Sequence, residues 1–284
     1  MLLEFTKRAN LELKLECDRN NYTIDTHRYT AYPLRLSRLF RLEPNAPQRA
    51  YFYITSISPG LLAQDELNLS IQLAANTSLY LTDQAATKVH SMPIIDSKAV
   101  VHYNIEVGEQ ATLEFIPEPM ILFADSTLQQ NICIKLHPSA RLCLSEIIIP
   151  GRLARGEFYD FHHYFSRLVV MSQDGELWFT DAMRLEGKLN PFKDKALFAT
   201  APILGNLFVV LPNTDLDLLS KRVEDLDSAH CSGLLVASSI LPQEKGILIR
   251  AIATTTRQLK QYLKYALNCV RQISNQPPLP YIPK

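Results

Sequence analysis

The first two thirds of the chain alternate apolar and polar residues with a period of two. Leucine and isoleucine occupy every second position of 67–73, and a similar alternation recurs over 101–107 and 132–136. Such a pattern gives each segment one apolar face, so we expect half-buried β-strands. The strands recur with short turns from about Leu11 to Leu211, with no helical period between them. A sandwich, a barrel or a β-solenoid would fit this spacing.

Helical periodicity is confined to the end of the chain. Thr214 is expected to cap a helix over 215–227, and a second amphipathic helix is expected over about 255–273. Residues 246–253 between them have the pattern of a strand. The proline-rich tail after Gln276 should be extended, because proline cannot continue a helix. We therefore expect one domain over 1–284, with a β-rich body over about 1–212 and a mixed C-terminal part over about 213–284.

Charge and composition indicate a cytoplasmic globular protein that does not bind nucleic acid or membranes. Lys+Arg and Asp+Glu both number 29, so the formal net charge is zero and no basic surface is indicated. A chain without net charge is also expected to be poorly soluble alone. The N-terminus lacks the pattern of a secretory signal, and no apolar run is long enough to span a bilayer.

The cysteines and histidines do not form a recognisable metal motif. The five cysteines are widely spaced and include no C-x-x-C pair, which argues against a disulfide framework and a zinc site. Cys133 and Cys143 are expected to be buried apolar residues. His162 and His163 are adjacent, so on a strand they would point to opposite faces and chelate one ion poorly. No catalytic motif is recognisable either, and we expect no enzymatic activity.

Two carboxylates lie on otherwise apolar strand faces. Alternation places Glu146 beside Leu142, Leu144 and Ile148, and places Asp181 on the face of Leu177 and Phe179, with Trp178 opposite. A buried carboxylate needs a cation, hydrogen-bond donors or water. The pattern alone favours internal ion pairs, with Arg152 or Arg155 as the cation.

Four sequence elements together resemble the UreD/UreH family of urease accessory proteins. They are the segment from Gly60 to Asp65, the T-x-x-x-A-T-K element from Thr82 to Lys88, the L-E-F-x-P-E element that contains Glu114, and the series Glu146, Gly151, Arg152, Gly156 and Glu157. Their order and spacing agree with the family from about Leu34 to Val210. Pro59 and Gln64 replace two family glycines, and Asp83 replaces a threonine. We expect the loop before Asp65 to change its conformation, because glycines often mark special backbone angles.

The resemblance implies a fold, a function and partners. The fold would be mainly β-helical with two C-terminal helices. The function would be that of a non-enzymatic chaperone that binds UreF and, with the GTPase UreG, docks on apo-urease and delivers nickel through an internal passage. The assembly would be a hetero-oligomer, possibly a dimer of heterotrimers. By their match to family acids, Asp65, Glu146 and Asp181 would line the nickel path. Ni²⁺ would bind only transiently, since oxygen ligands release it more readily than a Cys/His site.

Two other functions are compatible with the residues. A β-solenoid hydrolase could use Asp65 and Glu146 as paired carboxylates, although the chain has only one tryptophan with which to build a sugar-binding platform. A β-rich interaction scaffold without a metal role could use the proline-rich tail as a docking peptide.

Overall fold

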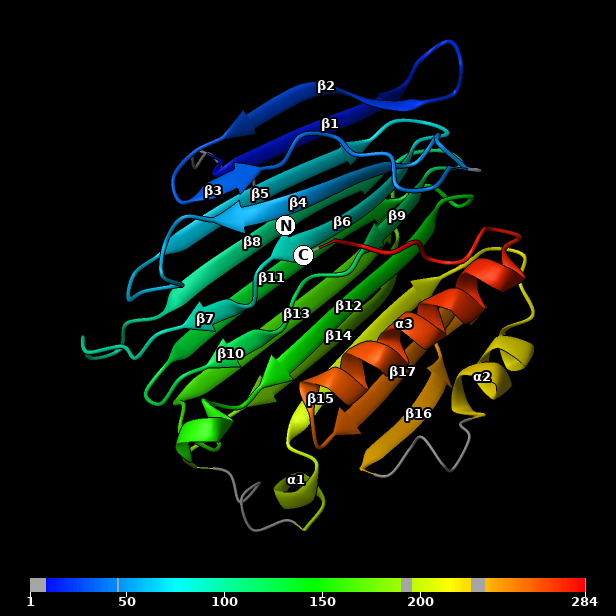
Figure 1. Ribbon diagram of the computed structural model, residues 1–284. Helices are drawn as coiled ribbons and strands as arrows, with labels where there is room; N and C mark the ends of the chain where they lie inside the picture. The colour runs from blue at the N-terminus through cyan, green and yellow to red at the C-terminus, as the bar shows by residue number, and fades with distance from the viewer. Residues whose placement is uncertain (1–8, 45, 190–195, 226–232, 284) are drawn as a thin grey trace.

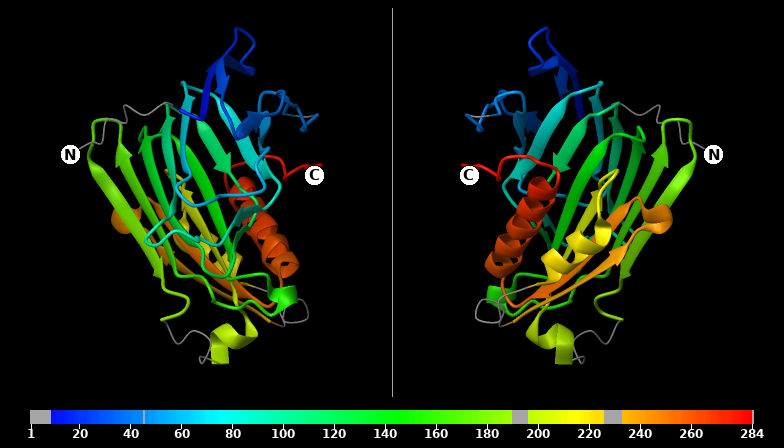
Figure 2. Two further views of the ribbon diagram at one scale, coloured as in Figure 1. Left: turned by 90° about the vertical axis from the view of Figure 1, so that its left-hand side faces the viewer. Right: turned by 90° about the vertical axis from the view of Figure 1, so that its right-hand side faces the viewer.

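Two β-sheets face each other and form the body of the molecule (Figure 1). The computed structural model describes residues 9–44, 46–189, 196–225 and 233–283. In Figure 2 the sheets form separate layers, and the long C-terminal helix lies outside them.

The first sheet has seven strands, and its inner five are parallel. Antiparallel strands form both edges. In sheet order the strands are β14 (Leu177–Leu185), β13 (His163–Ser172), β11 (Thr127–Leu136), β8 (Ala99–Val107), β5 (Glu66–Leu73), β1 (Leu11–Cys17) and β2 (Thr23–Thr30).

The second sheet combines a parallel part with an antiparallel extension. Its main path is β16 (Leu234–Ile240), β17 (Gly246–Ala253), β15 (Ile203–Val210), β12 (Arg141–Ile149), β9 (Thr112–Phe115), β6 (Ser78–Gln84), β4 (Ala50–Ser56) and β3 (Leu34–Leu36). The short strands β7 (Thr87–Val89) and β10 (Met120–Leu122) join it beside β12. β15 precedes Pro212 in the sequence and pairs with β17, which follows it. The second sheet therefore includes strands from both sides of the point where the sequence pattern changes.

The chain passes repeatedly from one sheet to the other, so the body is a β-solenoid. From β4 to β13, each strand of the first sheet alternates with one or two strands of the second, and successive turns add parallel strands to both sheets. The prediction of a mainly β, solenoid-like body is confirmed. Parallel coils explain why the sequence shows regularly spaced strands and no tight hairpins through this region.

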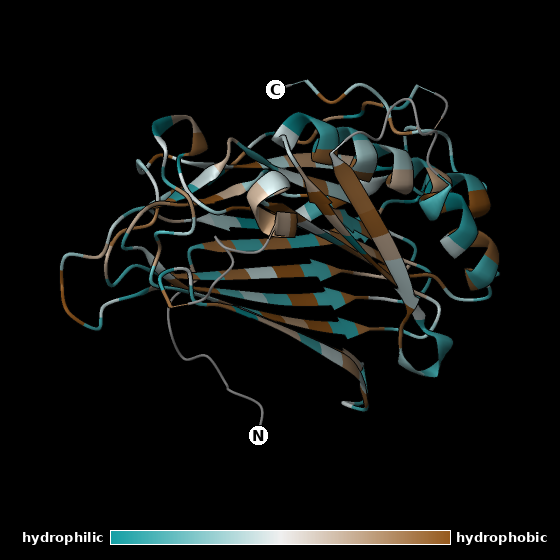
Figure 3. Ribbon diagram, turned by 90° about the horizontal axis from the view of Figure 1, so that it is seen from below, coloured by the Kyte–Doolittle hydropathy of each residue, from teal (hydrophilic) through white to brown (hydrophobic). Residues whose placement is uncertain are grey.

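The apolar positions of the alternating segments line the interior of the solenoid. Apolar residues at every second position of β5 and β11 are buried, including Leu69, Ile71, Ile132 and Ile134. Figure 3 shows the resulting alternate hydrophobic and hydrophilic bands along the strands. Burial of these faces against one another is the main source of stability of such a core.

Two helices pack near the antiparallel end of the second sheet, as predicted. Helix α2 (Leu216–Glu224) begins at the cap Asp215, whose Oδ1 accepts from the Leu218 amide at 2.8 Å, so the prediction of Thr214 as cap is wrong. The carboxylate is placed to accept this bond and also complements the helix dipole. The predicted end at residue 227 lies outside the described residues. Helix α3 (Thr256–Ile273) begins with a capping box between Thr255 and Gln258.

Three short helical segments were not predicted, because each is too short to show a helical period. They are the 3₁₀ turn η1 (Leu153–Arg155), helix α1 (Ala196–Thr200) and the 3₁₀ turn η4 (Pro242–Glu244). Within the described part of the chain, no helix is both long enough and apolar enough to cross a membrane.

The proline-rich tail is extended, as predicted, and is held on the molecule. The Leu279 amide donates to Asn268 Oδ1 of α3 at 2.8 Å, and Leu279 and Ile282 pack against the core cluster to which the buried residues of α3 belong. Cys143 is buried and Cys133 is half-buried, whereas Cys231 lies outside the described residues. The tail is thus an intramolecular contact in this structure.

Candidate functional site

A cavity of about 240 Å³ lies between the two sheets. It is found where the strands of the first sheet begin and the parallel strands of the second end. Its polar lining comes from both sheets: Tyr103, Gln130 and Tyr164 from the first, and Asp83, Glu118 and Glu146 from the second and its loops. The volume and the polar groups together allow several water molecules to be held inside.

Glu146 is the most deeply buried carboxylate of this lining. It is 8% exposed and shares the inner face of β12 with Leu142, Leu144 and Ile148, as alternation predicts. Its Oε1 accepts from Gln130 Nε2 at 2.8 Å, from Ser166 Oγ at 2.8 Å and from the Tyr164 hydroxyl at 3.4 Å. Its Oε2 accepts from Asn206 Nδ2 at 3.2 Å.

All four donors to Glu146 are uncharged, so the internal ion pair predicted for this residue is wrong. Arg152 pairs with Glu157 instead, in the loop that follows β12. The sequence pattern could not distinguish these cases, because the donors come from positions 16 to 60 residues away. Oε2 accepts a single bond from Asn206 and retains a lone pair for a further ligand.

Burial raises the pKa of the Glu146 carboxyl, while hydrogen bonds from Ser166 and Asn206 oppose this shift and the charge of Asp181 adds to it. Burial also raises the pKa of Tyr164 far above its ordinary value, so its hydroxyl remains a donor at neutral pH. The site therefore holds a buried carboxyl group whose hydrogen-bond donors are all neutral.

Asp181 lies on β14, the edge strand of the first sheet, and is ion-paired. Arg250 Nη2 of β17 donates to Asp181 Oδ1 at 2.6 Å. An ion pair was predicted here, but with Arg152 or Arg155 as the cation. The pair bridges the edge of the first sheet and the antiparallel extension of the second.

The predicted faces of β14 are partly wrong. Leu177 is 54% exposed and Trp178 is buried, although alternation places Leu177 on the Asp181 face and Trp178 opposite. The pairing of β13 with β14 shifts register between Val170 and Met171. Such a bulge adds one residue to a strand and reverses the alternation beyond it.

Asp65 lies in the loop before β5, outside the cavity lining. Its Oδ2 accepts from the Leu62 amide at 2.7 Å and so closes its own turn. Gln64 has a φ of 69°, the left-handed conformation that glycine favours. Of the three predicted acids, Glu146 and Asp181 lie close enough for their charges to interact, whereas Asp65 has a local hydrogen bond.

His163 is the first residue of β13 and His162 precedes it, and the two have different surroundings. His162 Nε2 lies 3.6 Å from Asp125 Oδ1 and its side chain is half exposed, whereas His163 stacks on Phe165. Burial lowers the pKa of His163. Within the residues that the structure describes, no group of three or more His, Cys, Asp or Glu side chains has the arrangement of a metal site.

Comparison with known proteins identifies the family. A family model described as UreD urease accessory protein matches residues 7–284. A protein named urease accessory protein UreD from Trichodesmium erythraeum (strain IMS101) is 54% identical over 275 residues, which cover 97% of this chain and 99% of the relative. A protein of the same name from Haloarcula marismortui is 30% identical over 270 residues, or 93% and 86% of the two chains.

The chain belongs to the UreD family of urease accessory proteins. The resemblance inferred from the four sequence elements is thereby confirmed, and those elements can be located in the fold.

The first two elements of the UreD family form one wall of the cavity. Gly60 lies so close to β7 that a Cβ atom there would be 2.4 Å from the Lys88 carbonyl oxygen, which accepts from the Leu61 amide at 2.8 Å. The buried Thr82 hydroxyl donates to the Ile116 carbonyl at 2.6 Å. These residues set the backbone of the wall, and the side chain of Lys88 is exposed.

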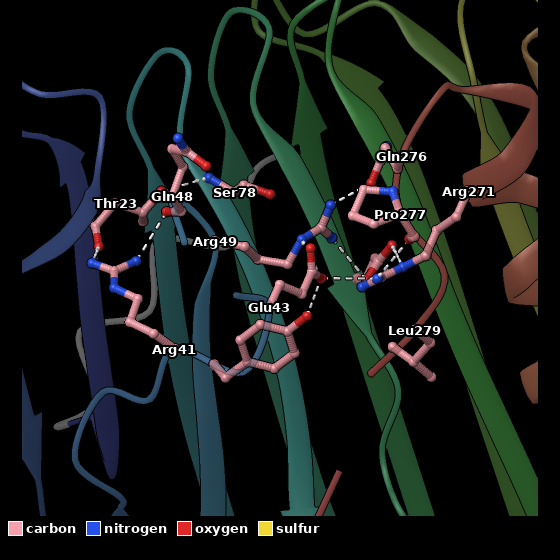
Figure 4. A network of polar contacts seen from close by, with 12 residues as sticks. Thr23, Arg41, Glu43, Gln48, Arg49, Ser78, Arg271, Gln276, Pro277 and Leu279 are labelled. Carbon is pink, nitrogen blue, oxygen red and sulfur yellow. Dashed lines mark hydrogen bonds and ion pairs between the residues drawn. The ribbon is translucent and has the colours of Figure 1, made fainter. Parts of the chain in front are cut away.

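Glu114, in the third UreD element, belongs to a buried ionic network that the sequence pattern did not reveal. Figure 4 shows other members of this network, Glu43, Arg49 and Arg271. Arg271 of α3 donates from Nε to Glu114 Oε1 at 2.9 Å and from Nη1 to Glu43 Oε1 at 2.9 Å. Arg49 Nη1 lies 2.8 Å from Glu114 Oε2, and Gln276 of the tail also binds Arg49. Two glutamates and two arginines thus cancel one another's charge between the solenoid, α3 and the tail.

The last UreD element forms the loop after β12. Glu157 accepts from the Arg152 amide at 3.2 Å and pairs with its guanidinium, which covers the Phe123 ring at 4.4 Å. A Cβ atom on Gly151 would lie 2.6 Å from the Glu157 carbonyl oxygen, and Gly156 ends η1 in the left-handed conformation. These contacts hold the loop in one conformation at the surface.

Proposed function

We propose that this chain is a non-enzymatic chaperone that takes part in urease maturation by passing Ni²⁺ through its interior toward apo-urease, together with UreF and the GTPase UreG. Membership of the UreD family supports the link to urease. The observation that carries the nickel role is Glu146, a buried carboxylate that lines a polar cavity and is held by neutral donors alone.

The chemistry of Glu146 suits a passing cation better than a resident one. A divalent ion that enters the cavity gains an anionic oxygen ligand without displacing a protein cation. One carboxylate with amide and hydroxyl neighbours binds a first-row metal more weakly than a thiolate and imidazole cage, so release is rapid. Glu118, in the same lining, is neutralised by Lys260 of α3 at 2.8 Å and is therefore a poorer ligand.

A carboxylate-pair hydrolase receives less support. Such an enzyme needs two carboxyl groups facing one substrate site. Asp65, the partner considered for Glu146, binds the Leu62 amide of its own loop and is outside the cavity lining.

The test uses Glu146→Gln and Asp181→Asn, singly and together, in cells that express the urease operon. Both substitutions keep shape and remove charge. We expect the yield of the complex with UreF to persist, while urease activation falls most steeply when nickel is scarce. Glu109→Gln, on an exposed turn, controls for the loss of one negative charge. Full activation by the double variant at limiting nickel would refute the nickel role, as would loss of the UreF complex in step with activity.

A further inference from the structure

A single polar row crosses the inner face of the second sheet from the cavity toward solvent. Glu146 on β12 is the register partner of Asn206 on β15, which in turn is the partner of Arg250 on β17. Register partners lie side by side on the same face of a sheet. Asn206 is 3% exposed, whereas the Arg250 side chain is 48% exposed, so the row begins in the core and ends in water.

Apolar rows flank the polar row on both sides. Two residues away in one direction, the partners across the three strands are Leu144, Phe208 and Leu248. Two residues away in the other direction, they are Ile148, Leu204 and Ile252. The ligand atoms of this part of the face are therefore confined to one row, because the adjacent rows provide none.

The solvent end of the row is closed by an ion pair between the sheets. Asp181 on the edge strand of the first sheet binds Arg250 with an Nη2 to Oδ1 distance of 2.6 Å. The guanidinium neutralises this carboxylate and occupies the point where an ion would enter or leave. Because about half of the Arg250 side chain is in solvent, the guanidinium can exchange Asp181 for water by turning outward.

We propose that Arg250 determines whether a divalent cation can occupy the solvent end of this row. This inference rests on the proposed function and assigns to Arg250 the control of access to Asp181 and, beyond it, to Asn206 and Glu146. With Arg250 on Asp181, the carboxylate is neutralised and offers a cation no net attraction. When Arg250 is turned outward, the row offers a cation the carboxylates of Asp181 and Glu146, with the side-chain amide of Asn206 between them.

The direct test is isothermal titration calorimetry, in which Ni²⁺ alone is added to the purified chain. We expect Arg250→Gln to lower the Kd at least about tenfold relative to the wild-type chain, because a positive charge next to the site is removed. Arg250→Lys keeps the charge and should bind like the wild type. Arg184→Gln, on the outer face of β14, is the matched control and should change nothing.

The double variant Asp181→Asn/Arg250→Gln tests whether the gain in Ni²⁺ affinity requires the Asp181 carboxylate. The gain in affinity should disappear, because the released carboxylate is gone. Equal affinities of Arg250→Gln and Arg184→Gln, or a gain that survives in the double variant, would overturn the proposal. Fluorescence of the buried Trp178 checks folding, and Arg250→Met replaces Arg250→Gln should the latter not fold.

The proposal and the nickel-delivery function fail separately. A gain in affinity for Arg250→Gln together with normal urease activation by Glu146→Gln would retain Arg250 as a determinant of cation access and reject delivery past Glu146. Impaired activation by Glu146→Gln with no change in affinity for Arg250→Gln would do the reverse.

Discussion

Replacement of Arg271 should destabilise the whole chain more than any surface ion-pair substitution. The Arg271 side chain is 0% exposed, and the Glu43 and Glu114 side chains that it binds are 4% and 2% exposed. Arg271→Met preserves most of the volume but leaves two buried glutamates to share Arg49. Removal of one partner from a buried pair costs about 3–5 kcal/mol, which for a chain of this size lowers the Tm by about 10 °C.

A double-variant cycle separates charge balance from packing. In Glu114→Gln/Arg271→Met, Glu43 and Arg49 remain as a balanced pair, so the combined cost should be well below the sum of the two single costs. Urea unfolding, monitored by the fluorescence of Trp178, the only tryptophan, measures each free energy of unfolding. Micromolar protein or less avoids the association expected of an uncharged chain. Arg184→Met serves as the surface control, with an expected cost of about 0–1 kcal/mol.

The same network predicts how stability depends on pH. Burial opposes the ionisation of Glu114, but Arg49 and Arg271 outweigh it and hold the pKa of this carboxyl below its ordinary value. The resulting stabilisation is present above the unfolded pKa of about 4.3 and is lost as the pH falls through the folded pKa. Glu114→Gln should lack this acid-dependent loss.

The account of the network would be refuted if the costs of Glu114→Gln and Arg271→Met were additive in the double variant. It would also be refuted if Arg271→Met cost as little as Arg184→Met.

Two further predictions concern the cavity. Because burial raises the pKa of Glu146, wild-type stability should fall relative to Glu146→Gln as the pH rises from the unfolded pKa of about 4.3 through the folded pKa. Urea unfolding of both chains at a series of pH values measures the difference. Gly60→Ala should cost about 1–3 kcal/mol, because the new methyl group would meet the Lys88 carbonyl oxygen at 2.4 Å, whereas Gly156→Ala, with no atom within 4 Å of its Cβ, should cost less. Equal losses of stability in the two alanine variants would contradict this account.

Periodicity predicted the elements whose environment depends on local sequence. The strands of the solenoid and helix α3 have one apolar face each, and the structure buries that face. The errors have local causes as well. The bulge at the start of β14 changes the faces of Leu177 and Trp178, and Asp215 caps α2 in place of its neighbour Thr214. Neither a bulge nor the choice between two adjacent caps leaves a mark on hydrophobic periodicity.

The partners of buried charges could not be predicted in the same way. Arg271 lies 157 positions from Glu114, and Asn206 lies 60 positions from Glu146. An arginine near the end of an amphipathic helix has the usual pattern of a solvated C-terminal cation. Only the docking of α3 and the tail against the second sheet turns it into the most deeply buried charge of the network.

Glu114 and Glu146 lie on adjacent strands of one sheet and differ in the face to which they point. Glu114 points outward beneath α3 and the tail, where two guanidinium groups favour its charged form. Glu146 points inward to the cavity, where dipoles solvate it and its carboxyl titrates at higher pH than usual. An apolar residue in its place would avoid the cost of desolvation. A buried carboxyl group kept there without a protein cation is what the proposed transient cation site requires, and the proposed role of the Arg250–Asp181 pair is to restrict access to it from solvent.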